Sequence, residues 1–117
     1  MRQPDNLLDP KHYERVRRPP LEAETLPPWC YTSPDWFELE RRHIFMKSWN
    51  LIGRGDRVPN PGDYVTFDYV GVPVILVRGR DNQVRAFANS CRHRGAIVAR
   101  EPEGNATNYF CFYHGWT

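Results

Sequence analysis

The chain has 117 residues, of which 40% are apolar and 26% charged, so it is long enough for one modest globular core. Its net charge of +2 does not favour a nucleic acid or a membrane surface as a partner. The sequence has no run of about 18 apolar residues and starts without the apolar segment of a signal peptide. We therefore expect a cytoplasmic protein with no membrane partner and no nucleic-acid partner.

Residues 1–33 are predicted to form a proline-rich arm. Proline lacks a backbone N–H and restricts the residue before it, so this segment is expected to be extended and irregular. Its prolines are Pro4, Pro10, Pro19, Pro20, Pro27 and Pro28.

One helix is predicted over residues 34–48. Ser33 is a suitable N-cap, and Pro34 suits the first helical position because its missing N–H would have no partner there. Phe37 and Ile44 recur at helical spacing among charged residues, which is typical of an amphipathic helix.

Residues 49–117 are predicted to form a mainly β domain. Apolar or alternating runs suggest closely spaced antiparallel strands at 49–53, 64–70, 72–78 and 83–89. Turn signals at 60–63 and 79–82 separate them. The expected fold is a small antiparallel β-sandwich, preceded by the arm and the single helix.

The most informative pattern lies in two loops of this domain. Cys91 and His93 form a Cys-x-His motif, and after 17 intervening residues Cys111 and His114 form a Cys-x-x-His motif. Each loop supplies one thiolate and one imidazole, which suits a two-iron, two-sulfur cluster with both cysteines on one iron and both histidines on the other. Gly95 and Gly115, after the two histidines, would let the chain turn and bring N–H groups near the sulfides.

A structural zinc site with two cysteines and two histidines is the main alternative, although zinc spacings usually pair Cys with Cys and His with His. The other candidates are weaker. Cys30 has no histidine or cysteine nearby, and it is expected to pack in a core or be a free thiol. His12 and His43 are expected to be structural or exposed.

The two motifs, with Arg94-Gly95 and Gly115-Trp116 as neighbours, resemble the Rieske motif of the large (α) subunits of aromatic-ring-hydroxylating oxygenases. The resemblance covers about residues 29–117 and includes Gly62-Asp63-Tyr64 and Asn89-Ser90-Cys91. One departure is Phe112, since many members of this family have proline directly after the second cysteine.

The resemblance implies a Rieske-type fold with inserted cluster-binding loops, at residues 49–117, that is incomplete at its C-terminal end. It implies one [2Fe–2S] cluster per subunit, held by Cys91, His93, Cys111 and His114, and a mononuclear Fe(II) only in a further domain. No catalytic residue is expected in this chain. A ferredoxin or flavin reductase would donate electrons, and the full-length subunit would form a homo-oligomer, commonly a trimer.

A stand-alone Rieske ferredoxin is the alternative function. Such carriers have about this length, but their motif usually lies in the middle of the chain with strands on both sides. Here the motif follows an arm and a helix, which favours the oxygenase relay.

Overall fold

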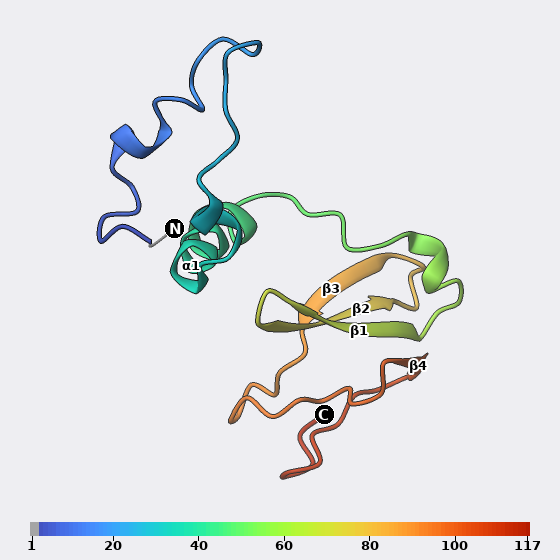
Figure 1. Ribbon diagram of the computed structural model, residues 1–117. Helices are drawn as coiled ribbons and strands as arrows, with labels where there is room; N and C mark the ends of the chain where they lie inside the picture. The colour runs from blue at the N-terminus through green and yellow to red at the C-terminus, as the bar shows by residue number, and fades with distance from the viewer. Residues whose placement is uncertain (1–2) are drawn as a thin grey trace. The chain divides into compact units, whose positions relative to one another are not determined.

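The computed structural model describes residues 3–117, and the chain divides into two units, Met1–Asn50 and Leu51–Thr117 (Figure 1). The first two residues of the predicted arm lie outside the described range. In the part of the chain that is described, no helix combines the length and apolarity needed to span a bilayer.

The arm contains more regular structure than its prolines predict. Short 3-10 helices form at η1 (Pro10–Tyr13) and η2 (Pro28–Tyr31), each with proline at its start. The Asp9 side chain caps the first by accepting a hydrogen bond from the Lys11 N–H at 3.0 Å. The expectation of an extended segment is wrong at these two places, because proline's fixed φ also suits a first helical residue.

Aromatic packing holds the first unit together. The Trp29 ring centroid lies 6.2 Å from that of Tyr13 and 5.5 Å from that of Trp36. Cys30 is buried next to Trp29, and burial raises the pKa of its thiol. Such edge-on contacts between rings contribute packing energy beyond the area they bury.

The predicted helix begins where expected and ends earlier. Helix α1 (Pro34–Glu40) is capped by the Ser33 side chain, which accepts from the Trp36 N–H at 3.2 Å. It runs on into one π-helical segment, η3 (Arg41–Phe45), so the helical part ends at Phe45 rather than at residue 48. The Asn50 side chain donates to the Phe45 carbonyl at 3.0 Å and so satisfies an acceptor at the helix end.

Glu38 on α1 gives this unit a pH dependence. Hydrogen bonds from Arg41 and Arg42 lower the pKa of Glu38 from 4.5 to about 2. Because the folded pKa is depressed, the stabilisation is present above pH 4.5 and is lost as the pH falls towards 2.

Glu38→Gln should lower the melting temperature near neutral pH, and the difference from the wild type should shrink as the pH falls from 4.5 towards 2. Glu22→Gln, at an exposed site, is the control, and an equal deficit at all pH values would contradict the assignment.

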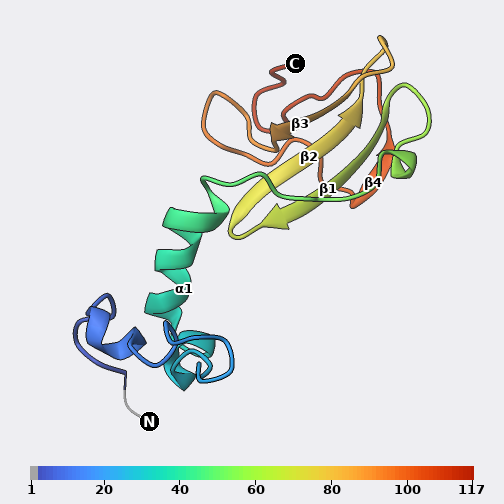
Figure 2. The same cartoon turned by 90° about the horizontal axis from the view of Figure 1, so that it is seen from above.

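The second unit is a four-stranded antiparallel sheet, which confirms the predicted mainly β class. Its strands are β1 (Asp63–Tyr69), β2 (Val72–Arg78), β3 (Val84–Ala88) and β4 (Glu103–Asn105). Their order across the sheet is β3-β2-β1-β4, and Figure 2 shows the long β1–β2 hairpin between the two shorter strands.

Turn chemistry sets the register of the two hairpins. Val70 and Gly71 join β1 to β2 with φ values of 44° and 85°, and the Asp68 carboxylate accepts from the Gly71 N–H at 2.7 Å. Two consecutive positive φ values match the twist of adjacent strands. The predicted loop at 79–82 joins β2 to β3, with the Gly79 N–H donating to the Gln83 carbonyl at 2.9 Å.

The structure differs from the prediction at both ends of the β region. Residues 49–53 form no strand, and Trp49 and Leu51 are exposed. Strand β4 was not predicted, because Glu-Gly-Asn has no apolar alternation. It forms because β1 offers a free edge, where the Thr66 N–H also donates to the Pro102 carbonyl at 2.8 Å.

The core of the sheet unit is small. Val58, which is 0% exposed, packs with Val65 of β1, Leu76 of β2 and the partly buried Phe67. Val58 follows the short 3-10 helix η4 (Gly55–Arg57). Hydrogen bonds from the Arg78 guanidinium of β2 hold this segment against the sheet. That group donates to the Val58 carbonyl and, at 2.9 Å, to the Gly55 carbonyl.

Leu76→Ala should destabilise the sheet unit by about 2–5 kcal/mol, since it removes transfer free energy and leaves a cavity. Urea denaturation measures this change. Leu51→Ala makes the same chemical change at a residue that is 95% exposed, and it should leave the free energy of unfolding nearly unchanged. Equal effects of the two variants would contradict the assigned core.

Candidate functional site

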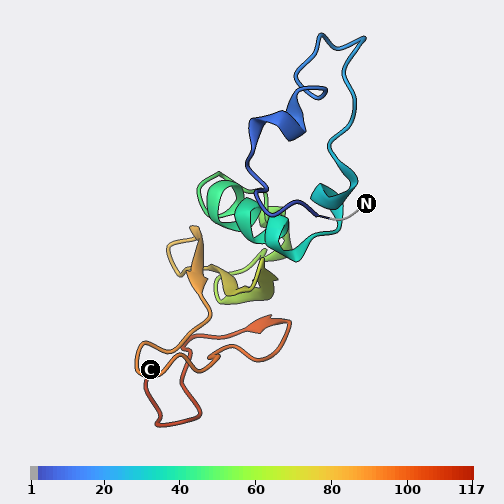
Figure 3. The same cartoon turned by 60° about the vertical axis from the view of Figure 1, so that its left-hand side comes forward.

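The four predicted ligand residues lie in two loops that come together. Cys91 and His93 follow β3, and Cys111 and His114 follow β4. Figures 1 and 3 show the two segments, coloured orange and red, side by side on one side of the sheet. The sheet therefore brings together motifs that are 17 residues apart in the chain.

The two loops share one backbone pattern. The Cys91 N–H donates to the carbonyl five residues ahead at 2.7 Å, and the Gly95 N–H donates back to the Cys91 carbonyl at 2.9 Å. Cys111 and Gly115 repeat both bonds at 2.7 and 2.8 Å. The two glycines have φ values of 75° and 72°, so the expectation of a left-handed residue after each histidine motif is confirmed.

The fold sorts the four side chains by type. Cys91 and Cys111 are only 8% and 2% exposed, and the Cys91 side chain is one of the groups that lower the pKa of the Cys111 thiol. The His93 and His114 rings face each other with their Nδ1 atoms 3.2 Å apart, and both residues are exposed. The thiols thus form a buried pair and the imidazoles a surface pair.

The surroundings of Cys111 favour its thiolate. The backbone N–H of Tyr113 donates to the sulfur and lowers the pKa of Cys111, outweighing desolvation, which would raise it. The Cys91 thiol, the His114 N–H and the Arg100 charge act in the same direction as the Tyr113 N–H. A thiolate is the form that binds a metal ion.

Two pairs suit a two-iron cluster better than a single ion. Two nitrogens bound to one tetrahedral ion at about 2.1 Å each lie about 3.4 Å apart, close to the observed distance between the Nδ1 atoms. Across residues 3–117, no three or more His, Cys, Asp or Glu side chains gather as one metal ion would require. A two-iron cluster needs only two protein ligands at each iron, so the residues present fit it.

Trp116 covers the histidine pair from one side. Its ring stacks on that of His93, with centroids 5.0 Å apart and an interplanar angle of 6°. Trp116 is 55% exposed, so it is not part of the core. It shields one face of the imidazole and leaves the pair open to solvent elsewhere.

Asn89 organises the first loop and had no predicted role. Its buried side chain accepts hydrogen bonds from the Val98 and Ala99 N–H groups at 3.2 and 2.9 Å. Its amide donates to the Ala99 carbonyl at 2.7 Å, and its backbone N–H donates to the Pro73 carbonyl of β2. These bonds, which we call the Asn89 clamp, close the base of the loop that carries Cys91. The sequence feature that could have identified Asn89 is its position as a polar residue between an apolar strand and the loop that carries Cys91.

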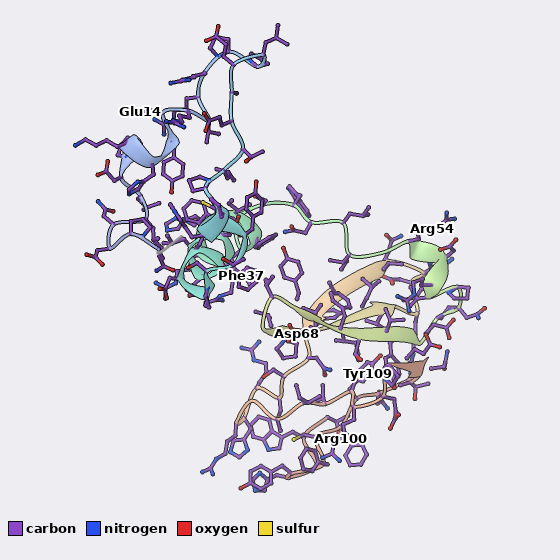
Figure 4. All side chains as sticks on the ribbon, in the orientation of Figure 1. Glu14, Phe37, Arg54, Asp68, Arg100 and Tyr109 are labelled. Carbon is purple, nitrogen blue, oxygen red and sulfur yellow. The ribbon has the colours of Figure 1, made fainter. Side chains whose placement is uncertain are left out.

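Tyr109 places the second loop against the sheet. Its ring packs edge-on against Tyr64 of β1, with centroids 5.5 Å apart, and Figure 4 shows it near the sheet rather than at the loop tips. Burial raises the pKa of Tyr109 to about 12, so the phenol remains neutral. Nothing in the sequence pattern identified this contact.

The other candidate residues lie apart from these loops, in the first unit. Cys30 is buried beside Trp29, and the His12 ring lies edge-on 5.9 Å from the same tryptophan. His43 is exposed on the helical segment. All three therefore have the structural or exposed settings that the sequence predicts.

Asn89→Ala should lower the free energy of unfolding of the sheet unit by about 2–4 kcal/mol, because it leaves buried backbone groups of Ala99 without partners. Asn108→Ala is the matched control, since Asn108 is exposed in the other loop. Chemical denaturation measures both. The clamp would be disproved if the two substitutions had the same effect.

Known proteins are similar to this chain in sequence and in fold. The α subunit of benzene 1,2-dioxygenase from Pseudomonas putida is 42% identical over 95 residues, covering 80% of this chain and 21% of that protein. The oxygenase subunit of carnitine monooxygenase from Escherichia coli is 43% identical over 98 residues, covering 83% and 26%. A solved structure of a quaternary ammonium Rieske monooxygenase is 40% identical, with a TM-score of 0.74, covering 80% of this chain and 26% of that one.

The chain thus spans about a quarter or less of the relatives that it matches. The family model for the Rieske [2Fe-2S] domain matches residues 48–117, which contain the sheet and both loops. Over that range, the chain belongs to the Rieske [2Fe–2S] domain family, whose cofactor is a two-iron, two-sulfur cluster.

Proposed function

We propose that Cys91 and Cys111 bind one iron of the cluster through their sulfurs, and that His93 and His114 bind the other through their Nδ1 atoms. The observation that carries this assignment is the sorting by residue type. The two cysteines are both buried, and Cys91 influences the pKa of the Cys111 thiol, while the Nδ1 atoms of the two histidines lie 3.2 Å apart. When bound, the cluster supplies one-electron redox chemistry.

We further propose that this domain relays electrons within a Rieske oxygenase. The relatives are α or oxygenase subunits, which supports the relay over a stand-alone ferredoxin. The exposed His93 and His114 edges offer the short path to a redox partner, whereas the cysteine side is buried. The oxygenase iron would lie in a domain outside these residues.

The partners follow from the same proposal. A ferredoxin or a flavin reductase would supply electrons to the histidine side, and the full-length subunit would assemble as a homo-oligomer, in this class commonly a trimer.

The relatives are named for unlike substrates, benzene and carnitine, so the Rieske part serves both dioxygenases and monooxygenases. Oxidation of an aromatic compound is the proposed activity of the whole protein.

The residues of the two loops perform distinct tasks in this proposal. The N–H groups of Tyr113 and His114 stabilise the negative charge on the Cys111 sulfur. Gly95 and Gly115 permit the tight turn of the first and the second loop, respectively. Trp116 excludes water from one face of His93. Hydrogen bonds to ligand sulfur and local burial are the protein's means of tuning such a centre.

The ligand assignment is tested by substitution in the full chain, with analysis of iron, acid-labile sulfide and zinc. Cys91→Ser, Cys111→Ser, His93→Gln and His114→Gln should each lose the cluster, because each removes half of the protein ligands of one iron. The wild-type protein, once reduced, should give a rhombic EPR signal with the low average g value of mixed His and Cys ligation.

The chain supplies its own matched controls. Cys30→Ser and His43→Gln make the same substitutions outside the two loops, and both should retain iron and sulfide. Zinc without sulfide in the wild-type protein would establish the structural zinc site instead. Retention of the cluster by Cys111→Ser, or by both histidine variants, would overturn the ligand assignment.

A further inference from the structure

A contact between an arginine and an aromatic ring joins the two loops next to a cysteine. The Arg100 guanidinium carbon lies 3.4 Å from the ring centroid of Phe112, the residue that directly follows Cys111. Arg100 itself follows Ala99, whose backbone is held by Asn89. The contact therefore links the clamped end of the first loop to the second loop, and Figure 4 shows Arg100 in this region.

Arg100 is followed in the chain by Glu101 and Glu103, but it forms no ion pair with either of them in the described structure. Residues 89–100 contain three arginines and no acidic residue, and residues 106–117 contain no charged Asp, Glu, Lys or Arg. Among the ion pairs of residues 3–117 none involves Arg100, and its guanidinium lies over the ring of the residue that follows Cys111. Arg92 and Arg94, in contrast, flank His93.

We propose that Phe112 holds the Arg100 guanidinium beside Cys111 and that this fixed positive charge raises the reduction potential of the cluster. The inference rests on the proposed cluster and its ligands. Reduction adds one negative charge, so a nearby cation stabilises the reduced form more than the oxidised form. A cation over an aromatic face is held in place by attraction to the ring quadrupole.

Phe112 supplies the aromatic face that this arrangement needs. A proline at this position, as in many members of the family it resembles, has no aromatic face to hold a guanidinium. Phe112 thereby acts as a positioning residue, and Arg100 supplies the positive charge without a bond to a ligand atom.

The test compares midpoint potentials, measured by EPR-monitored redox titration of the full chain with its cluster bound. Arg100→Gln should shift the potential to a more negative value, whereas Arg100→Lys, which keeps the charge, should retain most of the wild-type value. Phe112→Leu keeps every charge and releases the guanidinium, so its potential should lie between those of the wild type and Arg100→Gln. Arg80→Gln, in the exposed hairpin loop, is the matched control and should cause no shift.

The salt dependence of the potential shift distinguishes an electrostatic effect of Arg100 from a structural one. Arg100 is exposed, so the shift caused by Arg100→Gln should shrink in about 1 M salt, where the Debye length is about 3 Å. A wild-type potential in Arg100→Gln, or an equal shift in Arg100→Lys, would overturn the inference. Should Arg100→Gln fail to assemble, an unchanged potential in Phe112→Leu would overturn it. Absence of a cluster from the wild-type protein would instead overturn the proposed function.

Discussion

The candidate site depends on one backbone turn that is used twice. In each loop, a cysteine N–H closes a turn onto the carbonyl five residues ahead, and a left-handed glycine returns a bond to the cysteine carbonyl. A side chain at the glycine positions would strain the turn, because φ values near 75° are costly for residues with a Cβ. The histidine follows the cysteine by two residues in one loop and by three in the other, so one turn accommodates both spacings.

The surroundings give the two halves of the site different physical characters. Cys91 and Cys111 are buried, and hydrogen bonds to the Cys111 sulfur favour its thiolate against the opposing effect of burial. His93 and His114 are exposed, with Trp116 covering only one ring face. In the proposed cluster, electrons would exchange most readily on the histidine side, and Arg100, which lies over Phe112, would act on the cysteine side.

Hydrophobic patterns in the sequence predicted a strand correctly where that strand has both a neighbouring strand and an apolar face to bury. Residues 64–70 and 72–78 alternate or run apolar, and they appear as β1 and β2 within one residue of the expected limits. The run at 49–53 has a similar texture but lies exposed without a partner strand in the described structure. Strand β4 has no apolar pattern, and it exists only because the edge of β1 accepts it.

The sequence by itself determined the candidate ligands, their two spacings and the glycine turns, because these features are local and follow from ligand chemistry and φ restrictions. The pairing of ligands by type was also expected from the sequence, and the tertiary structure adds that the two imidazoles lie face to face at the surface while both cysteines are buried. It also revealed the Asn89 clamp and placed Arg100 over Phe112. These contacts join residues that the sheet brings together from separate loops, and no spacing within either loop encodes such a distance.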